Sequence, residues 1–191
     1  DVMHTPYKKD IVKQFVDACY KYGLKPHFYH TMQDWQHPLY EKDFERYNQY
    51  LRDSIKVLCT NYGEIGGFWF DGAWSNTEVD WKWDELYSLI RKYQPNTIIT
   101  NNTGIYNRGH RGHDEIDVVT FEQGHLIKMD NEGLRPLASE ACLTINNTWG
   151  SASKDINYKS IKELIENLTK CRKNDCNLLL NLAPKYNKNF T

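Results

Sequence analysis

Carboxylate side chains beside apolar segments are the residues of this chain best placed for chemistry. Asp71 comes directly after Phe-Trp-Phe and before a glycine, Glu122 ends the run VVTFE, and Glu140 stands near the start of the run 138–144. Cleavage of a glycosidic bond needs two such groups, one to attack the sugar or activate water and one to protonate the leaving oxygen. Asp71 also fits a turn or helix N-cap, and carboxylates at strand ends are common in proteins that are not enzymes. The pattern alone therefore leaves both interpretations open.

The elements that would position these carboxylates are predicted by hydrophobic periodicity. Apolar residues at spacings of three and four predict helices, and short apolar runs bounded by glycine and polar residues predict strands. The helices are expected at 7–23, 42–60, 83–93 and 157–172, and the strands at 25–30, 68–71, 97–100, 117–121, 138–144 and 177–182. Strands that alternate with helices indicate parallel β-α-β units, in a barrel or in a doubly wound sheet.

The barrel is the preferred fold class. No glycine-rich phosphate loop occurs at a strand-to-helix junction, which removes the main reason to expect a nucleotide-binding doubly wound sheet. In (β/α)8 barrels the active site lies at the carboxyl ends of the strands. The polar residues at or near the strand ends are Tyr29, His30, Asp71, Asn101, Asn102, Glu122, Glu140 and Asn181.

Composition excludes several classes of function. The 24 basic and 25 acidic residues give a net charge of −1, and the sequence shows no basic stripe. We therefore expect no nucleic-acid partner. No apolar run is long enough for a membrane span, so we expect no membrane partner. The 5 cysteines show no CxxC or Cys/His spacing and predict neither a disulfide framework nor a zinc site, and Cys19 and Cys59 fit core positions of helices.

Several segments resemble, in the same order, the α-L-fucosidases of glycoside hydrolase family 29. These segments are FYHTMQDWQHPLY, NYGEIGGFWFDGAW, IITNN, ASEACLTINNTWG and NLLLNLAP, of which FWFDG is the most specific. The resemblance implies a retaining α-L-fucosidase in which Asp71 attacks the sugar and forms a covalent fucosyl-enzyme. It implies Glu122 as the acid/base, with Glu140 as the second choice. Residues 1–191 would form the larger, C-terminal part of one catalytic barrel domain.

The resemblance also implies a set of residues for the sugar pocket. Tyr29 and His30 are expected to point most directly into it, Trp35 and His37 to support it, and Trp74 and Trp149 to cover the sugar or the leaving-group side. Trp69 is expected in the core. The expected pocket residues are Tyr29, His30, Trp35, His37, Trp74, Asn102 and Trp149.

Two departures from the family pattern qualify these expectations. The family's arginine shortly after the third predicted strand is missing, and Arg108 or Arg111 could take its place. The family's first strands and their histidines have no counterpart before Asp1. An open barrel exposes strand edges, so we expect further chain or a second copy to complete it.

The remaining expectations concern ligands, location and alternatives. A fucosylated glycan is the implied substrate, with no metal or organic cofactor, because two carboxylates and a water suffice. The resemblance favours a secreted, periplasmic or lysosomal location over the cytoplasm. Two alternatives remain: a fucose-binding homologue without turnover, and a related retaining glycosidase of other specificity, such as one acting on α-galactosides.

Overall fold

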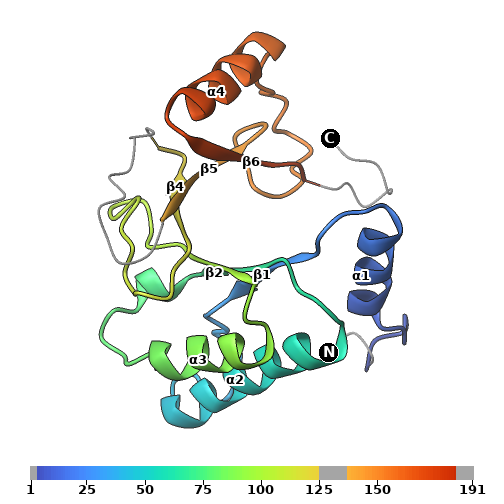
Figure 1. Ribbon diagram of the computed structural model, residues 1–191, viewed down its shortest axis with the longest axis vertical. Coiled ribbons are helices and arrows are strands. Elements are labelled where there is room, and N and C mark those ends of the chain that lie inside the picture. The colour runs from blue at the N-terminus through green and yellow to red at the C-terminus, as the bar shows by residue number, and fades with distance from the viewer. Residues whose placement is uncertain (1–3, 125–136, 184–191) are drawn as a thin grey trace. The chain divides into compact units, whose positions relative to one another are not determined.

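The computed structural model describes residues 4–124 and 137–183 (Figure 1). The chain divides into two compact units, residues 1–100 and residues 101–191. Both units are built from strands joined by helices or loops.

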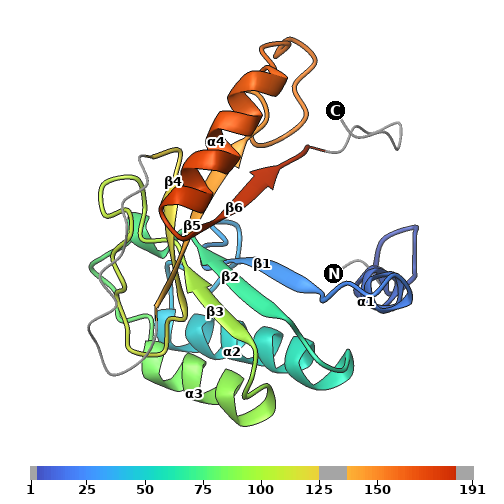
Figure 2. The ribbon, with the colours of Figure 1, turned by 45° about the horizontal axis from the view of Figure 1, so that its top comes forward.

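The first unit contains the strands β1 (His27–Thr31), β2 (Gly67–Asp71) and β3 (Ile98–Asn101, whose last residue begins the second unit), side by side in chain order (Figure 2). The strands β1 and β2 pair in parallel, with Tyr29 opposite Trp69 and Thr31 opposite Asp71. The helices of this unit are α1 (Ile11–Lys21), α2 (Phe44–Asn61) and α3 (Trp83–Tyr93).

The two faces of this sheet differ, because successive side chains of a strand point to opposite sides. Phe68 and Phe70 are fully buried, and the Phe70 ring lies 6.2 Å from that of Tyr87 in α3. Trp69 and Asp71 occupy the alternate positions of the same strand and are only partly buried. One face of β2 thus anchors the helices, and the other is available for chemistry.

Helix α2 shows how the sequence specifies this packing. Its buried residues include Tyr47, Leu51, Ile55 and Cys59, spaced by four so that they share one side of the helix. The side chain of Asp43 caps the helix by accepting a hydrogen bond from the backbone N–H of Arg46. The apolar side and the cap together fix where α2 begins and which way it faces.

The second unit contains the parallel strands β4 (Val118–Glu122), β5 (Ala138–Thr144) and β6 (Cys176–Asn181), with the helix α4 (Ile161–Lys173). Ala141 of β5 forms a buried cluster with Cys171 of α4 and Cys176 of β6. Glu140 and Asn177, at alternate positions, lie opposite each other in register. This sheet likewise has an apolar face toward its helix and a polar face away from it.

The predicted elements are confirmed, with shifts at two helix starts. The helix predicted from residue 7 begins at Ile11 and the one predicted from 157 begins at Ile161, because Asp10 and Ser160 act as N-caps. The five cysteines are buried and free, which confirms the core positions of Cys19 and Cys59. Among the described residues, no helix is long and apolar enough to cross a membrane.

Candidate active site

Asp71 is the last residue of β2, and two hydrogen bonds hold its carboxylate. The hydroxyl of Tyr29 donates to Oδ2 at 2.7 Å, and the indole Nε1–H of Trp74 donates to Oδ1 at 2.9 Å. Each oxygen therefore has a neutral donor, one from the middle of β1 and one from the turn after β2. A carboxylate whose orientation is fixed in this way is suited to attack one defined atom of a bound substrate.

The chain after β2 turns sharply, and this turn places Trp74. Gly72 has a left-handed backbone with φ of 92°, which glycine adopts without steric cost. A short 3-10 turn, Ala73–Ser75, follows, and the Ser75 hydroxyl donates to the Gly72 carbonyl at 3.0 Å. The glycine thus allows the indole to reach back to the carboxylate three residues earlier.

Tyr29 and Trp69 extend the surface around Asp71. Their rings stack with centroids 5.6 Å apart, on the same sheet face as the carboxylate. Tyr29 is 63% exposed. The structure places Tyr29, which the resemblance assigns to the sugar pocket, beside the carboxylate of Asp71. Trp69, which we expected in the core, lies on the same face and was missed as a site residue, although its position two residues before Asp71 could have revealed it.

His30 requires a correction, because it lies on the other face of β1. Its ring packs against Phe70 with centroids 6.1 Å apart, and its Nε2 lies 3.2 Å from the Ser54 hydroxyl of α2. Adjacent residues of a strand cannot both face one side, so His30 does not share the surface of Tyr29. His30 belongs to the contact between the sheet and α2.

This placement predicts a pH dependence of stability. Burial lowers the pKa of His30 below its usual 6.5, and a hydrogen bond with the Thr31 backbone opposes the shift. Below about pH 6.5 the unfolded chain binds a proton more readily than the folded one, so stability falls as the solution is acidified. We expect His30→Gln to reduce the loss of unfolding free energy between about pH 7 and pH 5, measured by urea denaturation. His110→Gln, at an exposed position, is the control, and an equal effect of both changes would contradict this role.

Trp35 and His37 lie in the loop that follows β1. The Trp35 Nε1–H donates to the side-chain oxygen of Gln33 at 3.0 Å. His37 stacks on Tyr50 of α2 with centroids 4.3 Å apart, and its Nδ1 accepts from the backbone N–H of Leu39. His37 therefore anchors the loop to α2, in line with the expected supporting role.

In the second unit, Glu122 is the last residue of β4 and is held by Asn102. The Asn102 Nδ2–H donates to Glu122 Oε2 at 2.6 Å, and the Asn102 Oδ1 accepts from the backbone N–H of Gly104 at 3.0 Å. Asn102 is only 2% exposed. The structure therefore gives Asn102 a contact with a carboxylate where the resemblance implied contact with the sugar.

Arg108 contacts the backbone next to this carboxylate. Its Nε–H donates to the carbonyl of Glu122, and its second terminal nitrogen donates to the carbonyl of Gln123 at 3.3 Å. Arg111 instead donates to the carbonyl of Asp114 at 2.8 Å. Of the two candidate replacements for the missing arginine, Arg108 is the one that contacts the end of β4.

Glu140 lies deeper in the sheet than Glu122. It pairs in register with Thr120, two residues before the end of β4, whereas Glu122 pairs with Cys142. Glu140 is buried, and its Oε2 accepts from Asn177 at 2.9 Å. Because barrel chemistry takes place at the carboxyl ends of strands, this position favours Glu122 over Glu140 as the acid/base.

Trp149 lies in the loop after β5 and is held through its backbone. Its carbonyl accepts a hydrogen bond at 2.8 Å from the side chain of Asn181, the last residue of β6. The indole is 41% exposed. Trp149 thus lies near a carboxyl end of the second unit's strands.

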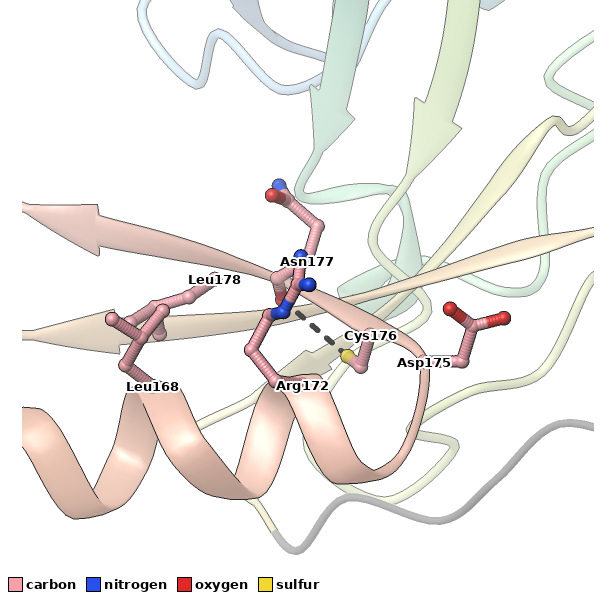
Figure 3. A pocket seen from close by; sticks show the side chains of 6 residues that line it. All are labelled: Leu168, Arg172, Asp175, Cys176, Asn177 and Leu178. Carbon is pink, nitrogen blue, oxygen red and sulfur yellow. Dashed lines mark hydrogen bonds between the residues drawn. The ribbon is translucent and has the colours of Figure 1, made fainter.

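A cavity in the second unit lies away from these strand ends. It is lined by Leu168 and Arg172 of α4 and by residues 175–178 at the start of β6 (Figure 3). The amino end of a barrel strand contributes to stability and not to catalysis. We therefore do not assign the active site to this cavity. Nor do the described residues include a group of three His, Cys, Asp or Glu side chains that could hold a metal ion.

Comparison with known proteins identifies the family of this chain. The model of the alpha-L-fucosidase family matches residues 1–190. Alpha-L-fucosidase 1 of Arabidopsis thaliana is 32% identical over 97 residues, which cover 50% of this chain and 19% of that protein. A putative alpha-L-fucosidase of Caenorhabditis elegans is 23% identical over 190 residues, or 93% of this chain and 37% of that protein.

Solved structures show the same fold. Alpha-L-fucosidase isoenzyme 1 from Paenibacillus thiaminolyticus has a TM-score of 0.81 and 33% identity, over 96% of this chain and 49% of that chain. AlfC from Lactobacillus casei, in complex with its alpha-L-fucose product, has a TM-score of 0.79 and 24% identity, over 98% of this chain and 62% of that chain. The expected fold class, an α/β barrel present in part, is confirmed. The chain spans less than two thirds of the length of these relatives, and it belongs to the α-L-fucosidase family of glycoside hydrolases, family 29.

Proposed function

We propose that the protein hydrolyses terminal α-L-fucosides of glycoconjugates or oligosaccharides, with retention, through a covalent fucosyl-enzyme. The observation that carries this proposal is the carboxylate of Asp71, which ends β2 and accepts hydrogen bonds from Tyr29 and Trp74. The retaining mechanism requires a nucleophilic carboxylate fixed beside the sugar. Membership of the family indicates the sugar, and the position of Asp71 at the end of β2 indicates the nucleophile.

In the first step, an oxygen of Asp71 forms a bond to the anomeric carbon of fucose while the glycosidic bond breaks. Glu122 gives its proton to the departing oxygen, so the aglycone leaves as a neutral alcohol. The hydrogen bond from Asn102 orients Glu122 for this transfer. The products of the step are the free alcohol and a fucosyl ester of Asp71.

In the second step, the Glu122 carboxylate removes a proton from water as that water attacks the anomeric carbon. The ester bond to Asp71 breaks, and fucose leaves with its original configuration after two inversions. Glu122 ends the cycle protonated and Asp71 ionised, as both began. The chemistry needs no metal or organic cofactor.

Solved structures of a related fucosidase support this substrate class. An Asp-to-Ala variant of AlfC was solved with 4-nitrophenyl α-L-fucopyranoside, described there as substrate, and a Glu-to-Ala variant is described as a fucosyltransferase mutant. We therefore propose a fucosylated glycan as the partner of this chain.

The test is to incubate the full-length protein with matched aryl α-L-fucosides and aryl α-D-galactosides and to identify the first sugar anomer released by NMR. We expect turnover of the fucoside, with α-L-fucose formed before mutarotation. Release of β-L-fucose first would contradict retention, and preference for the galactoside would contradict the substrate. Binding of fucose without any turnover would favour a non-catalytic homologue.

Asn102 offers a separate prediction about the acid/base. Asn102→Ala removes the donor to Glu122. Because a hydrogen bond to a charged group contributes about 1.5–3 kcal/mol, we expect a loss of roughly 10- to 100-fold in kcat/KM for methyl α-L-fucoside. The loss should be smaller for α-L-fucosyl fluoride, because fluoride leaves without a proton. Equal losses for both compounds would indicate a structural role only. Asn107→Ala, at an exposed position of the same loop, is the control.

A further inference from the structure

Trp35 is a large apolar side chain that the proposed chemistry does not use. It is 77% exposed, and its only polar ring atom is already engaged, because Nε1–H donates to Gln33 at 3.0 Å. The two faces of the indole therefore remain available while its orientation is held. Exposed, oriented indoles of this kind stack well on the C–H face of a pyranose ring.

Hydrogen bonds connect Trp35 to the turn after β2, which carries Trp74. The side-chain amide of Gln33 donates to the hydroxyl of Ser75, which in turn donates to the carbonyl of Gly72 at 3.0 Å. Gly72 directly follows Asp71, so three hydrogen bonds link the indole to the turn after the nucleophile. Trp35 is thereby positioned relative to the reacting carboxylate.

The start of the same loop is also fixed against the end of β2. The backbone N–H of Met32 donates to the carbonyl of Asp71 at 2.7 Å, and the hydroxyl of Thr31 donates to the carbonyl of Gln33 at 3.1 Å. Residues 31–33 are therefore fixed against the end of β2. Trp35 follows two residues later in the same loop.

The immediate surroundings of Asp71 are formed by other aromatic residues. Tyr29 and Trp74 contact the carboxylate directly, and Trp69 stacks on Tyr29. A fucose ring attacked by Asp71 must lie against this inner group. Trp35 is not one of these contacts but is hydrogen-bonded to the same turn through Gln33 and Ser75, which leaves its indole for the group beyond the scissile bond.

We propose that Trp35 is the stacking platform for the sugar ring from which fucose is cleaved, and so sets a preference for glycan over simple alkyl aglycones. The proposal rests on the fucosidase function. Aromatic stacking contributes about 0.5–1.5 kcal/mol beyond area burial, and 1.4 kcal/mol corresponds to tenfold. Loss of the indole should therefore lower selectivity for a second sugar ring by roughly tenfold.

The experiment compares two substrates of the full-length protein that need the same protonation. Methyl α-L-fucoside and a fucosyl disaccharide both release an alcohol, but only the disaccharide carries a second ring. For Trp35→Ala we expect the ratio of kcat/KM, disaccharide over methyl fucoside, to fall roughly tenfold, mainly through KM. Trp35→Phe, which keeps a ring, should restore most of the ratio. Tyr22→Ala, at a 71% exposed aromatic residue beyond α1, is the control and should leave the ratio unchanged.

If Trp35→Ala leaves the ratio unchanged, even with an equal loss of kcat/KM on both substrates, the proposal that Trp35 stacks on the second sugar ring is overturned. A wild-type protein that cleaves neither compound would instead contradict the fucosidase function. In that case, titration of fucose and of the disaccharide by calorimetry tests the platform alone. Tighter binding of the disaccharide than of fucose, with the difference abolished by Trp35→Ala, would support it, and equal binding of the two sugars would overturn it.

Discussion

Replacement of Asp71 by glycine should lower kcat/KM for an aryl α-L-fucoside by about 10⁴- to 10⁶-fold, the range seen when a nucleophile or a residue that supports one is removed. The carboxylate that would form the covalent intermediate is gone, and neither of its donors, Tyr29 and Trp74, can replace it. Asp114→Gly, the same change in an exposed loop, should retain near wild-type activity. Steady-state kinetics of both variants of the full-length protein provide the measurement.

Rescue of the Asp71→Gly variant by azide distinguishes a nucleophilic role of Asp71 from a structural one. In Asp71→Gly a small anion can enter the space of the missing carboxylate and attack the anomeric carbon from the same side. Turnover should therefore recover with azide concentration and give β-L-fucosyl azide, with inverted configuration. Lost activity without any rescue, combined with a lower unfolding temperature, would indicate that Asp71 only maintains the fold.

Replacement of Glu122 by glutamine should have the second largest effect, a loss of about 10²- to 10⁴-fold in kcat/KM for methyl α-L-fucoside. The amide keeps the size of the side chain but cannot donate a proton to the leaving oxygen as an acid does. Glu140→Gln is the matched control, because Glu140 lies two residues deeper in the sheet and is bonded to Asn177. A larger loss in Glu140→Gln than in Glu122→Gln would assign the acid/base to Glu140.

The azide product distinguishes the two carboxylates. In Glu122→Ala the fucosyl ester of Asp71 still forms from α-L-fucosyl fluoride, which needs no proton to leave. Azide then attacks this intermediate and gives α-L-fucosyl azide, with retained configuration. Identical azide anomers from the Asp71 and Glu122 variants would contradict this division of roles.

Much of the fold could be predicted from the sequence, because its signals are local. The apolar positions spaced by four in α2, from Tyr47 to Cys59, are visible without any structure. So is the compact run that ends in Asp71. The early start predicted for two helices has a local cause as well, since periodic apolar residues continue before the true N-caps, Asp10 and Ser160.

The site was only partly predictable, because its contacts join distant segments. The hydrogen bond from Asn102 to Glu122 spans 20 residues and depends on how the loop after β3 folds. The assignment of His30 to the pocket failed for a simpler reason. A segment typical of a family identifies a region, but the two-residue alternation of a strand decides which neighbour faces it, and here that neighbour is Tyr29.

The paired donors on Asp71 have a consequence for the balance between the two halves of the proposed cycle. When one oxygen becomes the ester oxygen, its hydrogen bond weakens, while the other oxygen keeps its donor as the ester carbonyl. Departure of the sugar returns negative charge to the carboxylate, and both donors then stabilise it as a leaving group. Tyr29 and Trp74 would thus moderate the nucleophile's reactivity in the forward attack and speed the breakdown of the ester, which keeps the covalent intermediate short-lived.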